Sequence, residues 1–299
     1  MQFKHASTLA WVLCLSYAGA GMAADSKPAA VVKLSAAQIV ERNIAARGGL
    51  QAWHEVRTMS WSGKMEAGTG DTTARSRRYT EAALMPKPRL SGQQDRNAPI
   101  VLPPNIGKPV TDKQVQLPFL LDMERPHKSR LEVEFAGKTA VQVYDGKQGW
   151  KLRPFLNRTD VEPFTADEAK AEASKAGLEG PLIDYAAQGT KVAYDGVEAV
   201  GGSDAYRLVL TLKDGTVRHV WIDASTFLDV KVEGSPRWMD GKLRSVWVYQ
   251  RDFRPVQGVM LPFSYETAVE GYADTHKMTI EKAEVNPKLD AALFSKPGA

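Results

Sequence analysis

The chain has 299 residues, a formal net charge of +4 at neutral pH and 43% hydrophobic residues. This length suffices for one large domain or two small ones with a sizeable core. The small basic excess is spread along the chain, and no basic run is interleaved with aromatic residues, so a nucleic-acid partner is not expected.

The first 23 residues follow the order of a secretory signal peptide. A short basic start at Lys4 is followed by an apolar stretch over 9–15 and by small residues at Gly21 and Ala23. The alternative is an uncleaved membrane anchor, but the apolar stretch is short for about 30 Å of hydrocarbon. We therefore expect residues 1–23 to be removed and the remaining protein to be soluble outside the cytoplasm.

The only cysteine, Cys14, lies inside that apolar stretch. It follows Leu13 rather than Gly or Ala, so it does not have the setting of a lipidation cysteine. Removal of the signal would leave no cysteine, which excludes a disulfide framework, a thiol nucleophile and thiolate metal sites. Residues 24–34, which include Pro28, are expected to form a flexible leader.

Two helices are predicted next along the chain. Ser35 and Gln38 make a capping-box pattern that opens a helix running to Ala46, and Gly48-Gly49 ends it. A second, short helix is expected over 50–55.

Alternating apolar and polar residues predict strands from residue 58 onward. Met59, Trp61 and Met65 alternate with polar residues, which is the two-residue period of a strand with one dry face. Residues 130–135 alternate in the same way. Asp145-Gly146 between alternating runs is a strong hairpin signal.

Two segments interrupt the strand pattern. Residues 86–118 contain seven of the chain's 17 prolines, a density that forbids helix and interrupts sheet pairing, so we expect a long loop or insertion there. Residues 165–188 are a predicted helical block. Thr165 opens a second capping box, and Gly180-Pro181 restarts a short helix over 182–188.

The remaining sequence predicts a meander of strands joined by tight turns such as Asp195-Gly196 and Asp240-Gly241. About ten strands in sequence order imply an antiparallel sheet with neighbours paired. A few helices cannot cover both faces of so large a sheet. We therefore expect a mainly β (α+β) fold, a single domain over 35–299 whose sheet curls into an incomplete barrel with helices covering the concave face. The meander strands are expected near 191–194, 198–200, 205–212, 217–223, 228–233, 243–253, 260–271 and 277–285.

Sequence motifs give no catalytic or metal site. His54-Glu55 resembles the start of a zinc-protease motif, but Thr58 stands where the second histidine would be. The other histidines are scattered, and there is no nucleophile elbow, phosphate loop or dinucleotide fingerprint. We expect no enzyme, no metal and no cofactor.

Aromatic and aliphatic residues of the predicted strands are better candidates. Aromatic side chains bury much area at low entropy cost and can line an acyl-binding hollow. The alternative for any single residue is that it only packs helices onto the sheet. Because there is too little helix to fill the hollow, the set predicts an apolar ligand site lined by Trp61, Met65, Leu131, Val133, Phe135, Trp150, Leu208, Leu210, Trp221, Trp247, Phe263 and Tyr265.

Five segments resemble those of a known family, and they occur along the chain in the same order as in that family. They are Ile44-Ala-Ala-Arg-Gly-Gly-Leu50 with Gly63 beyond it, Tyr144-Asp-Gly-Lys-Gln-Gly-Trp150, His219-Val-Trp-Ile-Asp223, Phe253-Arg-Pro-Val-Gln-Gly-Val-Met-Leu-Pro262, and Asn286-Pro-Lys-Leu-Asp-Ala-Ala-Leu-Phe294 followed by Pro297. The chain resembles the outer-membrane lipoprotein-sorting proteins of Gram-negative bacteria, the periplasmic carriers with a LolA/LolB-type fold.

This resemblance implies an incomplete antiparallel β-barrel closed by a helical lid. Its apolar hollow would shelter the acyl chains of a lipoprotein, without catalysis and without a cofactor. The chain is longer than the short dedicated carrier, and the 86–118 and 165–188 segments look like additions to the basic pattern. The family's lid residues are not carried over to any position here.

Two functions from different classes remain open at this point. The leading one is a monomeric periplasmic carrier of lipoprotein acyl chains, lipid acyl chains or another apolar ligand, with a protein partner in the inner or outer membrane left open. The alternative is an envelope interaction or stress-sensing module that binds a protein partner without transporting a ligand. An enzyme would need a polar constellation inside the hollow.

Overall fold

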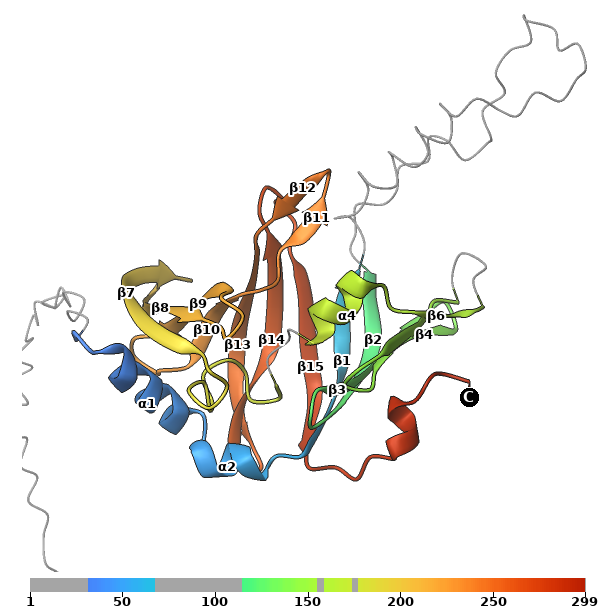
Figure 1. Ribbon diagram of the computed structural model, residues 1–299, viewed down its shortest axis with the longest axis horizontal. Coiled ribbons are helices and arrows are strands. Elements are labelled where there is room, and N and C mark those ends of the chain that lie inside the picture. Colours follow the sequence, from blue (N-terminus) through green and yellow to red (C-terminus); the bar gives the residue numbers. More distant parts are fainter. Residues whose placement is uncertain (1–31, 68–114, 155–158, 174–176, 299) are drawn as a thin grey trace, which may run out of the picture. The chain divides into compact units, whose positions relative to one another are not determined.

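A large, curled and unclosed antiparallel sheet dominates the computed structural model (Figure 1). The structure describes residues 32–67, 115–154, 159–173 and 177–298. By its contacts the chain divides into two units, Met1–Val32 and Lys33–Ala299, and the sheet belongs to the second. The expected signal peptide, residues 24–31 of the expected leader and residues 86–114 of the proline-rich segment lie outside the described residues.

Thirteen strands form the sheet, in the order β6-β5-β4-β3-β2-β1-β15-β14-β13-β10-β9-β8-β7. Two further strands, β11 (Arg237–Met239) and β12 (Lys242–Arg244), pair only with each other. The expectation of about ten strands was therefore too low. The sheet strands are β1 (Thr58–Ala67), β2 (Val115–Glu124), β3 (Lys128–Phe135), β4 (Lys138–Tyr144), β5 (Gly149–Leu152), β6 (Val161–Pro163), β7 (Lys191–Val200), β8 (Ser203–Thr211), β9 (Val217–Asp223), β10 (Asp229–Glu233), β13 (Val246–Val256), β14 (Val259–Val269) and β15 (His276–Val285).

Two of the differences from the expected strands have clear local causes. Pro118, assigned to the loop, lies within β2, where it pairs with Lys64 of β1, while the pairing of β2 with β3 begins only at Phe119. The missing N–H of a proline is tolerated where one side of a strand is unpaired. Asp195-Gly196, expected to be a turn, instead forms a bulge inside β7.

The helices agree in part with the predictions. α1 (Ala36–Ala46) begins with the predicted capping box, in which the Ser35 hydroxyl accepts from the Gln38 backbone N–H and the Gln38 side chain accepts from Ser35 N–H. α2 (Leu50–Glu55) and α4 (Ala166–Ala173) are also present, with a short 3-10 helix at Ala291–Phe294. The predicted helix over 182–188 is wrong, because these residues form turns and Asp184 has a φ of 54°.

The two faces of the sheet have different surroundings. We call the side that carries Met59, Trp61 and Met65 the inner face, and the opposite side the outer face. Trp53 of α2 shares one buried cluster with Met59 and with Phe263 of β14 on the inner face. α1 packs beside β7 at one end of the sheet (Figure 1). Near the other end of the strand order, Glu168 of α4 pairs with Lys151 of β5. The helices thus cover the inner face only in part, whereas we expected them to lie across it. No described helix is long and apolar enough to span a bilayer.

Candidate binding face

Strand register builds a continuous surface on the inner face. Residues that pair across antiparallel strands point to the same face of a sheet. The paired positions therefore define one row of side chains across six neighbouring strands, which is apolar over four of them and polar over the last two. From β15 to β5 the row is Ala283, Trp61, Leu121, Leu131, Gln142 and Lys151.

The apolar part of this row is only partly buried. Trp61 stacks on Tyr265 of β14 with ring centroids 5.7 Å apart and an interplanar angle of 28°. The indole N–H of Trp61 is buried without a hydrogen-bond partner among the described residues. Residues on this surface pack against the buried core and leave their other side open, so they form an apolar surface between α2 and α4. Its partly buried members are Trp61, Met65, Leu121, Leu131, Val133, Tyr265 and Met278.

The structure brings only some of the twelve predicted ligand residues together. Leu208 and Leu210 are on the inner face but fully buried, so they belong to the core, and Phe135 lies exposed at the end of β3. Trp150, Trp221 and Trp247 lie on the outer face, because their register partners do. The others gather around one core cluster: Trp61, Met65, Leu131, Val133, Phe263 and Tyr265.

Two of the outer-face tryptophans, Trp221 and Trp247, belong to a polar cluster. Trp221 Nε1 donates to Glu198 at 2.9 Å, and the Lys231 ammonium lies 4.0 Å from the Trp221 ring centroid. The same ammonium lies 5.6 Å from the Trp247 ring centroid and 5.8 Å from that of Tyr249. The hydrogen bond from Trp221 lowers the pKa of Glu198 below its ordinary value, so this carboxylate stays ionised beside Lys231 at neutral pH. The faces of these three rings are therefore occupied by the Lys231 ammonium and do not form part of the apolar surface.

A buried ionic network, which the sequence did not reveal, holds α1 and α2 against the sheet beside the apolar surface. Arg47 lies just after α1, and its Nε is 3.4 Å from Asp229 Oδ2 of β10. Arg47 Nη1 donates to the Glu179 carbonyl at 2.5 Å, and Arg125 Nη2 lies 2.8 Å from Glu179 Oε2. Trp53 Nε1 donates to the Arg47 carbonyl at 2.9 Å. The network joins both helices to the sheet, and its one sequence signal was the Arg-Gly-Gly of the family segment.

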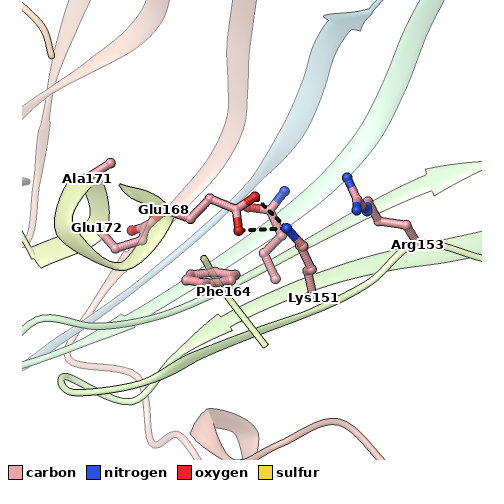
Figure 2. Close-up of a pocket in the computed structure, with 7 residues that line it drawn as sticks. Lys151, Arg153, Phe164, Glu168, Ala171 and Glu172 are labelled. Atoms are coloured by element: carbon pink, nitrogen blue, oxygen red, sulfur yellow. Dashed lines mark hydrogen bonds and ion pairs between the residues drawn. The ribbon is translucent and has the colours of Figure 1, made fainter. Parts of the chain in front are cut away.

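The polar end of the row opens into a small cavity of about 160 Å³. Figure 2 shows Glu168 reaching from α4 to Lys151, whose Nζ lies 2.5 and 2.6 Å from the two carboxylate oxygens. Desolvation opposes ionisation of Glu168, but hydrogen bonds from Lys151 and Thr165 outweigh it and lower the pKa of the carboxyl. Gln142, Arg153, Phe164, Ala171 and Glu172 complete the lining.

A second hollow, of about 420 Å³, lies beside the β7–β8 turn and is lined by Val200, Asp223, Val230, Arg251 and Phe253 among others. Among the described residues, no group of three or more His, Cys, Asp or Glu side chains is arranged to hold a metal ion. Neither hollow lies on the apolar part of the row.

Tyr265 gives this face a test at alkaline pH. Desolvation raises the pKa of its hydroxyl above the ordinary value, while the charge of Arg47 acts in the opposite direction. A raised folded-state pKa stabilises the fold fully below the unfolded pKa of about 10 and loses that contribution as the pH rises through the folded pKa. Urea unfolding at pH 9 and pH 11 should show a smaller pH-dependent loss for Tyr265→Phe than for the wild type. Equal losses in both proteins would show that the Tyr265 hydroxyl is solvated.

Comparisons with known proteins identify the fold. No protein-family model matches the sequence, and no curated protein matches it. A LolA superfamily protein from Nitrosomonas europaea aligns with a TM-score of 0.50 and 13% identity, covering 88% of this chain and 99% of that one. A DUF1329 family protein from Desulfovibrio piger aligns with a TM-score of 0.51 and 10% identity, covering 87% of this chain and 97% of that one. This chain has a LolA-like fold.

A domain from Vibrio parahaemolyticus, described as a candidate outer membrane lipoprotein-sorting protein, is 12% identical at a TM-score of 0.49, with 87% of this chain and 95% of that domain covered. The matches to the Nitrosomonas europaea and Desulfovibrio piger proteins confirm, at the level of fold, the resemblance found in the sequence. The sequence segments that carried the resemblance have structural roles in this chain. Asn286 Oδ1 accepts from Arg57 N–H at 2.6 Å, and Asp223 Oδ1 accepts from the backbone N–H groups of Ser225 and Thr226. LolA-like segments of this chain therefore set turns and strand ends.

Proposed function

We propose that this protein binds and carries an acyl chain of a lipoprotein or lipid, or another apolar ligand, on the inner face of its sheet. The observation that carries the proposal is the partly exposed apolar row of Trp61, Leu121 and Leu131 between α2 and α4. The LolA-like fold supports it, because the carriers that the sequence resembles shelter acyl chains in the apolar hollow of an incomplete barrel.

The energetics of such a face suit an acyl ligand. Each methylene removed from water contributes about 0.8 kcal/mol, so several methylenes suffice for binding without polar contacts. The stacked Trp61 and Tyr265 rings offer rigid apolar area at low entropy cost. The face needs no rearrangement of its core, since these side chains already pack against buried neighbours.

The setting of this function is part of the same proposal. The signal-like residues 1–23 support a periplasmic carrier after their removal. Carriage requires neither catalysis nor a cofactor, and a monomer could exchange its ligand with a protein of the inner or outer membrane.

Isosteric polar substitutions on the apolar row test the proposal. Leu131→Gln combined with Val133→Thr keeps side-chain volume but places polar groups under the ligand. We expect binding of 1-decanol, measured by isothermal titration calorimetry, to weaken about tenfold or more, because tenfold corresponds to only about 1.4 kcal/mol.

The matched control is Leu243→Gln combined with Val217→Thr. Both of these residues are exposed, and neither lies on the inner face. It should bind 1-decanol as the wild type does. Failure of the wild type to bind 1-decanol, or equal weakening in both double variants, would rule out the inner face as the binding site.

A further inference from the structure

Lys151 lies where the apolar row ends. Leu131, Gln142 and Lys151 are register partners on the successive strands β3, β4 and β5. At about 4.8 Å per strand, Lys151 stands roughly 10 Å from Leu131 and roughly 19 Å from Trp61 along the row. A ligand lying across the strands would therefore have its tail near Trp61 and its other end near Lys151.

The Lys151 ammonium is in a position that requires an anion. The residue is only 8% exposed, and a buried cation is costly unless it is paired. Both carboxylate oxygens of Glu168 supply the anion now, at 2.5 and 2.6 Å (Figure 2). The charge at this end of the row thus selects a carboxylate-like partner.

The helix that supplies this anion is weakly fixed to the sheet. α4 has no buried residue, and the Glu168 side chain is 42% exposed. Glu168 also closes the capping box of its own helix, since Thr165 N–H donates to it at 2.8 Å. The Glu168 carboxylate therefore has a role within α4 that does not depend on Lys151.

Space and donors for a second anion lie beside the ion pair. The cavity of about 160 Å³ is well above the roughly 10–15 Å³ that one water molecule needs. Gln142 carries an amide donor, and the Arg153 guanidinium, which pairs with Glu162 at 2.9 Å, lines the same space. Phe164 forms an apolar wall there.

We propose that Lys151 is the head-group site of the inner face and that the ligand is a single-chain amphiphile with an anionic end, a carboxylate or a phosphate monoester, which exchanges with Glu168. This inference rests on the proposed function and names its ligand class. Burial of the acyl chain drives binding, and the head group replaces an anion that the protein already supplies. The preference for an anionic head is consequently modest in the wild type and larger once Glu168 no longer competes.

Calorimetric titration with decanoate, decyl phosphate and 1-decanol, which share one chain length, tests the proposal. We expect the wild type to bind decanoate and decyl phosphate about tenfold more tightly than 1-decanol. Glu168→Gln should increase this preference, because glutamine retains the capping geometry and removes the competing charge. Lys151→Gln should abolish the preference and leave 1-decanol binding unchanged, whereas Lys64→Gln, at an exposed lysine of the outer face, should behave as the wild type does.

The outcomes separate the two proposals. Equal affinity for decanoate and 1-decanol in the wild type and in Glu168→Gln overturns the head-group site and leaves the carrier proposal standing. Absence of binding for all three probes overturns the carrier proposal and this inference together. Acetate that binds as tightly as decanoate would show a site for small anions and not for the end of an acyl ligand. Thermal unfolding checks that Lys151→Gln is folded. If it is not, the change in the preference for decanoate over 1-decanol in Glu168→Gln tests the proposal by itself.

Discussion

Replacing Asp229 with asparagine is expected to lower the free energy of unfolding by about 3 kcal/mol. Asp229 is 2% exposed and Arg47 is 5% exposed, so the substitution keeps the shape of the site but leaves a buried guanidinium without its carboxylate. Breaking a buried pair costs more than the pair contributes, because the remaining charge stays desolvated. Urea unfolding followed by tryptophan fluorescence measures the change.

Asp252→Asn is the matched control for this experiment. Asp252 pairs with Arg254 at 2.6 Å, but about half of each side chain is exposed, and such solvent-screened surface pairs contribute little to stability. The double variant Arg47→Met with Asp229→Leu should recover much of the loss, since apolar side chains of similar volume need no partner. A loss in Asp229→Asn no larger than that in Asp252→Asn would contradict the role assigned to the network.

Replacing Gly63 with alanine is expected to cost about 3 kcal/mol or to prevent folding. A Cβ at this position would lie 2.0 Å from the Thr279 carbonyl oxygen and 2.9 Å from the Glu281 backbone nitrogen. Both contacts are with backbone of the paired strand β15, which cannot move aside without breaking the sheet. The register of β1 against β15 shifts between Ser62 and Gly63, whose partners are Lys282 and Ile280, so Glu281 is the extra residue of a bulge in β15 opposite this glycine.

The bulge lies opposite the apolar surface of β1. A bulge bends its strand, and Trp61 and Met65 of β1 pair with β15 on the two sides of this one, at Ala283 and Met278. Gly234→Ala is the control, because its Cβ would lie 3.3 Å from the Val246 side chain and no nearer than 3.7 Å to the Val246 carbonyl oxygen. It should change the free energy of unfolding by less than about 1 kcal/mol. If Gly63→Ala and Gly234→Ala had similar urea unfolding midpoints, the backbone of β15 would be able to move away from a Cβ at residue 63, contrary to this prediction.

The sequence determined the local elements because their causes are local. The capping box at Ser35 and Gln38 requires only residues three positions apart, and the alternation of Met59, Trp61 and Met65 reflects one strand's own geometry. The LolA-like fold also followed from short segments, since Asn286 and Asp223 organise turns and strand ends through nearby backbone. Conversely, the helix predicted over 182–188 failed, although Gly180-Pro181 is a sound start signal.

Only the tertiary structure decided which strand positions share a face. Alternation shows which residues of one strand lie together, but the phase between strands depends on register, and a bulge or a changed turn length reverses it. That is why Trp61 and Tyr265 stack on the inner face, whereas Trp221 and Trp247 gather around Lys231 on the outer face. The pairing of Lys151 with Glu168 and of Arg47 with Asp229 likewise joins elements distant in sequence. No local pattern records such a contact, because its energy exists only once the chain has brought the two charges together.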